Sequence, residues 1–161
     1  MSGRYYPQKD LDTIEKFNRE LLGEPNISND GIIDQFVILY RPSVYETDTN
    51  MYGESSEGKV YQQGVKLPCV VDAEDFDFNI SEFGADNRQN VSFAFQRAYL
   101  VEVDLKPDIG DILKWNEGYF EVNTYNENQL VGGQPDNSHS IIVQAHLTRL
   151  STTNIEEHRG F

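Results

Sequence analysis

The sequence predicts a mainly β protein of the α+β class, a small antiparallel β-barrel or sandwich with an N-terminal helix and one long polar loop. Three observations support this class. Residues 91–105 alternate between apolar and polar side chains, residues 111–150 hold four short strand-like stretches separated by Asn- and Gly-rich turns, and residues 10–22 show a helical period. Strands this close together, with no helix between them, must pair antiparallel.

The helix is expected over residues 10–22, "DLDTIEKFNRELL". Its apolar residues fall near one stripe, formed by Leu11, Ile14, Leu21 and Leu22 with Phe17 between them. Asp10 and Asp12 suit the first turn, and Gly23 and Pro25 end the helix. We expect the apolar stripe to pack on the sheet.

The next stretch, "IIDQFVILY", predicts a buried strand that ends at Arg41 and Pro42. Residues 43–66 then form the long polar loop, which carries Tyr45, Tyr52 and Tyr61. A loop of this length inside a compact domain is usually functional or disordered, and its tyrosines argue against disorder. After the loop, "KLPCVVDAEDF" predicts a short strand that runs into an acidic turn.

The clearest strand signal is the alternation along "VSFAFQRAYLVEVDL". Its apolar set is Val91, Phe93, Phe95, Tyr99, Val101, Val103 and Leu105, and the intervening positions include Ser92, Ala94, Gln96, Glu102 and Asp104. We therefore expect one strand through residues 91–105. The stretches "DILKW", "YFEVNTY", "NQLVGG" and "SIIVQAHLTRL" continue the sheet, and residues 150–161 form a C-terminal tail.

The composition fits a single domain over residues 1–161. Hydrophobic residues make up 38% of the chain and aromatic residues 12%, which is too rich in large apolar groups for a disordered protein. Cys69 is the single cysteine, so the sequence predicts no disulfide, no cysteine-based metal site and assembly in the cytoplasm. "MSGRYYPQKD" has no apolar core, so we expect neither an export signal nor a membrane span.

The charge is strongly acidic, with 27 acidic and 13 basic residues and a net charge of −14. Half of the excess negative charge lies in residues 43–90, which contain ten acidic and three basic residues. Such a surface repels phosphate backbones, so sequence-specific nucleic-acid binding is disfavoured. Solubility is the simplest explanation of the charge, although the acidic segment has room for a role of its own.

The stretch "GESSEGKV", residues 53–60, matches most of the phosphate-binding loop of nucleotide hydrolases. The chemistry does not support the match, because Val60 stands where Ser or Thr would hold magnesium. Gly64 and Pro68 prevent the helix that should follow, and Glu54 and Glu57 would repel the phosphates. We expect no nucleotide site here.

Other catalytic and metal patterns are equally weak. His139, His146 and His158 lack metal-ligand spacing, and His146 is expected to be a half-exposed structural residue. Calcium-loop frames starting at Asp48 or Asp72 place the wrong residues at the sixth or twelfth position. Cys69 lies in the apolar "LPCVV" and should be a buried, inert thiol. We therefore expect no enzyme, no catalytic or metal residue and no cofactor.

Two segments of the chain carry a recognisable pattern. The first is "LKPDIGDILKWNEGYFEVNTYNENQLVGGQPD", with Gly110, Asp111, Ile112, Phe120, Glu121, Val122 and Asn123 at the patterned positions. The second is "YRPSVYETDTNMYGESSEGKVY", where Tyr52, Gly53 and Glu54 form an aromatic-Gly-Glu triplet. Both segments resemble the neck proteins of contractile-tailed, T4-like bacteriophages, and together the resemblance spans residues 38–136. The chain departs from the family at Ser43, where an Arg is usual, and we expect no counterpart of the long C-terminal extension that the family's larger member carries.

The resemblance implies a structural virion protein of the neck, assembled in the host cytoplasm, that forms a homo-oligomeric ring, expected to be a hexamer. Such a ring closes the portal channel after DNA packaging and docks the tail. Its partners would be the portal-adaptor (head-tail connector) protein and the tail-terminator protein, with genomic DNA as transient, non-specific cargo and no membrane. Within this chain, the expected contact residues are Tyr45, Tyr52, Tyr61, Arg159 and Phe161.

The four residues Gly110, Asp111, Trp115 and Phe120 are expected to serve the fold rather than a contact. We expect Gly110 to take a positive φ at the turn into the strand, Asp111 to accept hydrogen bonds from local backbone N–H groups, and the two aromatic residues to supply core surface. Two alternatives to the neck function stay open. One is another connector, tail-terminator or stopper protein of the same virion. The other is a carbohydrate-binding or glycan-hydrolysing β-domain that uses the acids of residues 72–77, which would require a concave pocket with converging carboxylates.

Overall fold

A computed structural model describes residues 8–24, 29–43, 60–75, 77–81, 84–127 and 139–148. Most of the expected loop, the stretch "NQLVGG" and the tail at 150–161 lie outside these residues.

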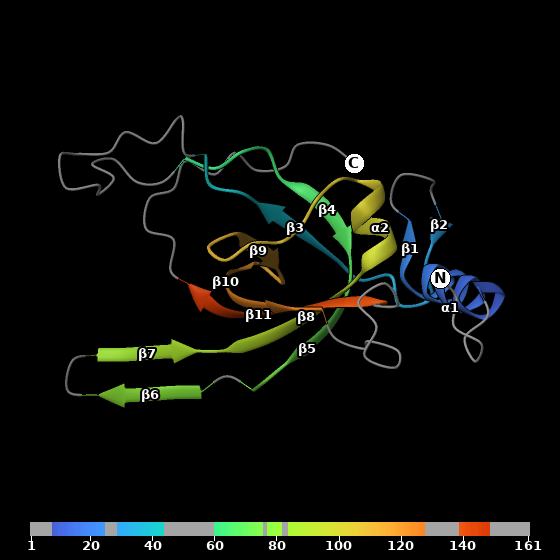
Figure 1. Cartoon of the computed structure of the whole chain (residues 1–161). Coiled ribbons are helices and arrows are strands. Elements are labelled where there is room, and N and C mark those ends of the chain that lie inside the picture. Colours follow the sequence, from blue (N-terminus) through green and yellow to red (C-terminus); the bar gives the residue numbers. More distant parts are fainter. Residues whose placement is uncertain are drawn as a thin grey trace.

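The centre of the protein is one seven-stranded antiparallel sheet (Figure 1). In sheet order its strands are β4 (Val65–Pro68), β3 (Phe36–Tyr40), β9 (Ile112–Trp115), β10 (Gly118–Asn126), β11 (Ser140–Thr148), β8 (Asn90–Gln96) and β5 (Val70–Ala73). Every neighbouring pair is antiparallel. The predictions of a mainly β fold and of antiparallel pairing are therefore confirmed.

The two edges of this sheet are joined through a single residue. β4 and β5 are the edge strands, and Cys69 connects them. The Cys69 N–H donates to the carbonyl of Gln35 at 3.0 Å, and the residue is 0% exposed. The sheet thus curls round its core until its edges meet at Cys69, without a ladder of hydrogen bonds between β4 and β5 to close it.

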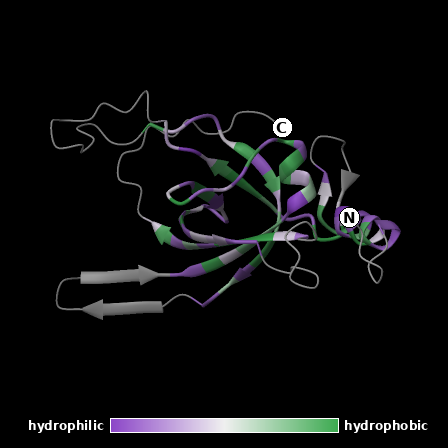
Figure 2. Ribbon diagram, in the orientation of Figure 1, coloured by the Kyte–Doolittle hydropathy of each residue, from purple (hydrophilic) through white to green (hydrophobic). Residues whose placement is uncertain are grey.

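The core lies inside this curl. Alternate residues of strands such as β8 supply it, and the strands around it carry hydrophobic stretches (Figure 2). Three aromatic rings meet at its centre: Phe93 lies 6.0 Å from Phe120 and 6.3 Å from Trp115, centroid to centroid, both edge to face. Burial of such large side chains is the main source of stability for a domain of this size.

The N-terminal helix α1 spans Gln8–Leu22 and is followed by a short pair of strands, β1 (Gly23–Glu24) and β2 (Asn29–Asp30). Only part of the expected apolar stripe is buried. Leu11 and Leu22 lie in the interior, whereas Ile14, Leu21 and Phe17 are exposed, Phe17 to 59%. The helix therefore presents a second apolar face to solvent.

A second helix, α2 (Arg97–Glu102), replaces the second half of the strand expected over residues 91–105. The strand ends at Gln96 because the apolar phase is interrupted by Arg97. Beyond it, the adjacent residues Tyr99 and Leu100 are both buried. A strand sends neighbouring side chains to opposite faces, whereas one turn of helix can bury both.

β5 ends at Ala73, and the acidic residues Glu74 and Asp75 that follow it are not part of a strand, but a further two-stranded ladder then begins at Asp77 that the sequence did not predict. β6 (Asp77–Ser81) pairs with β7 (Gly84–Arg88), and this β6–β7 ribbon projects beyond the sheet from the ends of β5 and β8 (Figure 1). The strand expected from Ile32 begins only at Phe36, because Ile32 and Ile33 lie in a bend and are exposed.

Candidate functional site

The part of the expected contact loop that the structure describes is its base. Residues 41–43 and 60–62 lie antiparallel, and we refer to them as the loop stem. The Ser43 N–H donates to the carbonyl of Val60, the Gln62 N–H donates to the carbonyl of Arg41, both at 2.8 Å, and Pro42 forms a bridge with Tyr61. The stem continues the β3–β4 pair, so the chain is held in place at Ser43 and at Val60, on either side of residues 44–59.

An ion pair holds this stem against a distant turn. The Arg41 guanidinium donates from Nη2 to Asp111 Oδ2 at 3.2 Å, approaches Asp111 Oδ1 through Nε at 3.4 Å, and also donates to the carbonyl of Lys106. Asp111 is only 2% exposed. A buried carboxylate needs such a partner, because its desolvation is otherwise costly.

The turn that carries Asp111 is built by local hydrogen bonds. Gly110 has φ +91°, a conformation that favours glycine, and its N–H donates to the carbonyl of Val122 at 3.1 Å. Asp111 Oδ2 accepts the N–H of Asp108 at 2.9 Å. The predictions that Gly110 adopts positive φ and that Asp111 bonds to local backbone are confirmed, and Trp115 and Phe120 pack in or against the core.

The two segments that carry the sequence resemblance therefore meet in space. Arg41 stands at the start of the second segment, and Asp111 belongs to the motif of the first. Sequence reasoning did not single out Arg41. The signal available was a basic residue at the end of a buried strand in an acidic chain, but its partner lies 70 residues away.

Of the predicted contact residues, Tyr61 is described. It is half-buried at the stem, and burial raises the pKa of its hydroxyl, with a further rise from the negative charge of Glu121. Tyr45, Tyr52, Arg159 and Phe161 lie outside the described residues. The structure thus brings Tyr61 to the stem, where Pro42 pairs with it.

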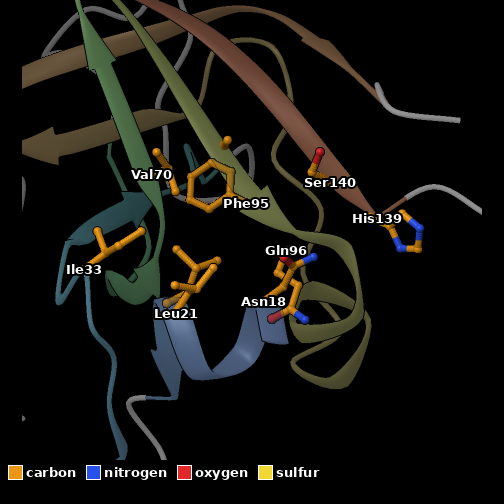
Figure 3. A pocket seen from close by; sticks show the side chains of 10 residues that line it. Asn18, Leu21, Ile33, Val70, Phe95, Gln96, His139 and Ser140 are labelled. Carbon is orange, nitrogen blue, oxygen red and sulfur yellow. The ribbon is translucent and has the colours of Figure 1, made fainter. Parts of the chain in front are cut away.

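A pocket of about 260 Å3 lies elsewhere, between α1 and the ends of β5 and β8 (Figure 3). Its lining is apolar or neutral: Asn18, Leu21, Leu22, Ile33, Val70, Ala94, Phe95, Gln96, His139 and Ser140. No carboxylate lines it, whereas Asp72, Glu74 and Asp75 are exposed on and after β5. The converging acids that a glycan hydrolase requires are therefore not found in this pocket.

The remaining candidate sites are a metal centre, a reactive thiol, a functional histidine and a phosphate loop. Within the described ranges, no group of three His, Cys, Asp or Glu side chains could hold a metal ion. Burial raises the pKa of the Cys69 thiol to about 12, which suits the predicted inert thiol. His146 is half-buried on β11, with Nδ1 2.7 Å from Asn123 Oδ1. Residues 53–59 of the phosphate-loop pattern, Asp48 and His158 lie outside the described part.

Comparisons with known proteins show a similarity in fold to a solved structure. No protein family model matches the chain, and no curated protein matches it. A solved chain in the virion of a native gene transfer agent particle is similar in fold, with a TM-score of 0.50 and 13% sequence identity, covering 70% of this chain and 91% of that one. Neither described helix is long and apolar enough to cross a membrane.

Proposed function

We propose that this protein is a structural component of a phage-like virion, located at the neck. The observation that carries the proposal is the similarity in fold to a chain of the gene transfer agent virion, because it extends over 91% of that chain. The T4-like resemblance of residues 38–136 supports the same class independently of the fold.

The proposed role is a ring, expected to be a hexamer, that closes the portal channel after DNA packaging and receives the tail. The loop stem supports this role, because its hydrogen bonds and the Arg41–Asp111 pair give residues 44–59 a rigid base. Tyr45, Tyr52 and Tyr61 are the proposed contacts with the portal-adaptor protein. The segment that ends in Arg159 and Phe161 is the proposed second docking site, towards the tail-terminator protein.

The acidic charge suits a channel through which DNA passes. A net charge of −14 repels the phosphate backbone, so DNA would move past the ring without adhering to it. Nucleic acid is therefore proposed as transient cargo and not as a bound ligand.

The test is the mass of the purified full-length protein by multi-angle light scattering, alone and mixed with the portal–adaptor complex of the same virus, followed by negative-stain imaging. A ring that forms on the complex supports the neck. A ring that binds isolated tail tubes and not the portal–adaptor complex would move the protein to the tail-terminator station. A protein that stays monomeric and binds neither the portal–adaptor complex nor tail tubes would overturn the proposal, and the next step would be a screen for glycan binding.

The loop contacts have their own test. Tyr52→Ala should leave the melting temperature of the monomer unchanged and weaken binding to the portal–adaptor complex, because tyrosines are enriched among the residues that anchor protein interfaces. Tyr52→Phe is the matched control, since it keeps the aromatic side chain and should bind the portal–adaptor complex nearly as well. Loss of monomer stability in Tyr52→Ala would instead place Tyr52 in the core.

A further inference from the structure

Strand β5 is one of the two edges of the sheet, and half of its backbone groups point away from the sheet. The Glu74 N–H donates to the carbonyl of Asn90 at 3.1 Å, in register with the β5–β8 ladder. Because hydrogen bonds alternate between the two sides of a strand, the even-numbered residues bond to β8, whereas the backbone groups of Val71 and Ala73 point outward. Over the described residues, no hydrogen bond reaches these outward groups.

This edge is open because the chain before β3 turns away from it. The Cys69 N–H donates to the carbonyl of Gln35 at 3.0 Å. In the same register, the next hydrogen-bonded pair would join Ile33 to Val71. Asp34 instead has φ +45°, and the Ile33 N–H donates to a carbonyl in the last turn of α1 at 2.9 Å. The attachment of residue 33 to α1 thus removes the partner that would have covered Val71.

The other edge strand, β4, is closed to a further strand. By the same alternation, its outward backbone groups belong to Lys66 and Pro68. Pro68 has no N–H and is buried, and the Lys66 ammonium lies over the ring of Phe36, 4.3 Å from its centroid. Proline and lysine are residues by which edge strands avoid unwanted pairing. β5, with the sequence "VVDA", contains neither.

Three carboxylates flank the open edge of β5. Asp72, Glu74 and Asp75 are all exposed. On β8, the residue opposite Asp72 is the neutral Ser92, and the side-chain amide of Asn90 donates to Glu74 Oε2 at 3.2 Å. Within the described part of the chain, no basic side chain forms an ion pair with any of the three. A strand that adds to this edge therefore meets negative charge that has no cation beside it.

We propose that the open edge of β5 accepts an extended, basic segment of a partner protein as an additional strand. The outward N–H and C=O groups of Val71 and Ala73 supply the backbone hydrogen bonds, as in other complexes formed by strand addition. Asp72 and Glu74 lie on one face of the strand, so Lys or Arg side chains on the same face of the added strand lie beside both carboxylates. The inference does not rest on the proposed neck function, because the open edge is a property of the sheet.

Charge is the reason for choosing a partner other than a second copy of this chain. Opposite charges on neighbouring strands stabilise their pairing, and like charges destabilise it. Two β5 edges that paired with each other would bring Asp72 and Glu74 of both copies together, in molecules that each carry a net charge of −14. A basic segment gains from the same carboxylates that disfavour a second copy.

Amide NMR of the isotope-labelled full-length protein tests the contact, with a short peptide that alternates Lys with Val as the probe. The amides of Val71 and Ala73 should shift and become protected from hydrogen exchange, because each gains an acceptor. The amide of Glu74 is the internal control, since it already donates to Asn90 and should gain no protection. The same peptide with Glu in place of Lys should bind roughly tenfold more weakly, or worse.

Two sets of variants separate backbone pairing from charge. Ala73→Pro removes an outward N–H and no bond to β8, so it should weaken binding of the Lys peptide roughly tenfold. Ala73→Val keeps the N–H and is the matched control. Asp72→Asn combined with Glu74→Gln should weaken binding about threefold to tenfold and reduce its dependence on salt. The melting temperature of each variant is measured, so that a loss of folding is not mistaken for a loss of binding.

Protection of the two outward amides by the Lys peptide alone, and its loss in Ala73→Pro, supports the added strand. Equal binding of the Lys and Glu peptides, or shifts spread over the surface without protection of Val71 and Ala73, overturns the proposal. If the two amides become protected as the protein concentration rises without peptide, a second copy occupies the edge and the basic partner is excluded. None of these results bears on ring assembly at the portal–adaptor complex, so failure here leaves the neck function standing.

Discussion

The carboxylate of Asp111 is buried, and Arg41 supplies the cation beside it. Arg41→Ala would leave this carboxylate with the N–H of Asp108 but without its charged partner. Because the Arg41 side chain is itself partly exposed, we expect a loss of about 1–3 kcal/mol in the free energy of unfolding, measured in urea.

Two further variants give this prediction its controls. Arg41→Lys keeps the charge and loses the forked geometry, so its stability should be intermediate. Lys16→Ala removes a cation from the exposed side of α1 and should change stability by less than about 0.5 kcal/mol. If Arg41→Ala were no less stable than Lys16→Ala, the ion pair would not hold the stem.

Cys69 gives a prediction in alkaline solution. Burial raises the pKa of its thiol from 9.0 to about 12, so between these values the unfolded chain releases a proton that the folded chain keeps. The free energy of unfolding should therefore be constant below pH 9 and fall as the pH rises above it, by at most about 1.4 kcal/mol per pH unit from this group. Urea titrations from pH 7 to 10.5 measure the fall.

Tyrosines also titrate in this range, so the informative quantity is the difference between wild type and Cys69→Ala. The cavity left by the substitution shifts stability by a constant amount, whereas the lost thiol removes part of the slope above pH 9. Parallel curves for the two proteins would contradict the assigned shift.

The residues of the site differ in how far sequence could predict them. Gly110 and Asp111 were predictable, because a positive φ and a bond to the N–H of Asp108 are decided within a few residues. The role of Arg41 was not, because its partner comes from a strand connection far along the chain. Local chemistry can be inferred from a sequence pattern, whereas a long-range ion pair depends on the order of strands.

At the level of elements, periodicity predicted the strands well and failed at their ends. β8 follows the alternation from Val91 to Phe95, and the pattern then admits either a longer strand or a helix until Tyr99 and Leu100 are seen to be buried together. The β6–β7 ribbon escaped prediction for a different reason. Its two strands, "DFNIS" and "GADNR", are short and contain Asp, Asn and Gly residues, which are typical of turns and uncommon in strands.

The β3–β4 pair beneath the stem yields a prediction about packing. A Cβ on Gly64 would lie 2.5 Å from Ile38 Cγ2 and 2.7 Å from Tyr40 Cε1, closer than carbon atoms can approach. Gly64→Ala should therefore force β3 and β4 apart and cost about 1–3 kcal/mol of unfolding free energy. Gln63→Ala, at the exposed neighbouring position, is the control and should be nearly neutral, and equal stability of the two variants would refute the close approach.

At the scale of the whole molecule, the fold class followed from composition and alternation, but the curling of the open sheet, which brings its two edge strands together at Cys69, did not. The chain leaves one sheet edge at Pro68 and joins the other at Val70, and this passage depends on which strands become edges. Sequence patterns report burial along a strand and not its neighbours in space. The helical period likewise predicted the N-terminal helix. It could not predict which side of the helix packs on the protein, and so not that Ile14, Phe17 and Leu21 stay exposed.

The net charge of −14 would make assembly of the proposed ring sensitive to salt. At low ionic strength the copies would repel one another over a long range, whereas at 0.5 M salt the screening length falls to a few ångströms. If the contact between copies is apolar, sodium chloride between 0.05 and 0.5 M should strengthen ring formation, measured as the protein concentration at half-assembly by light scattering. Urea unfolding of the monomer at the same salt concentrations separates this effect from a gain in monomer stability. Weaker assembly at high salt would instead mean that ion pairs hold the copies together.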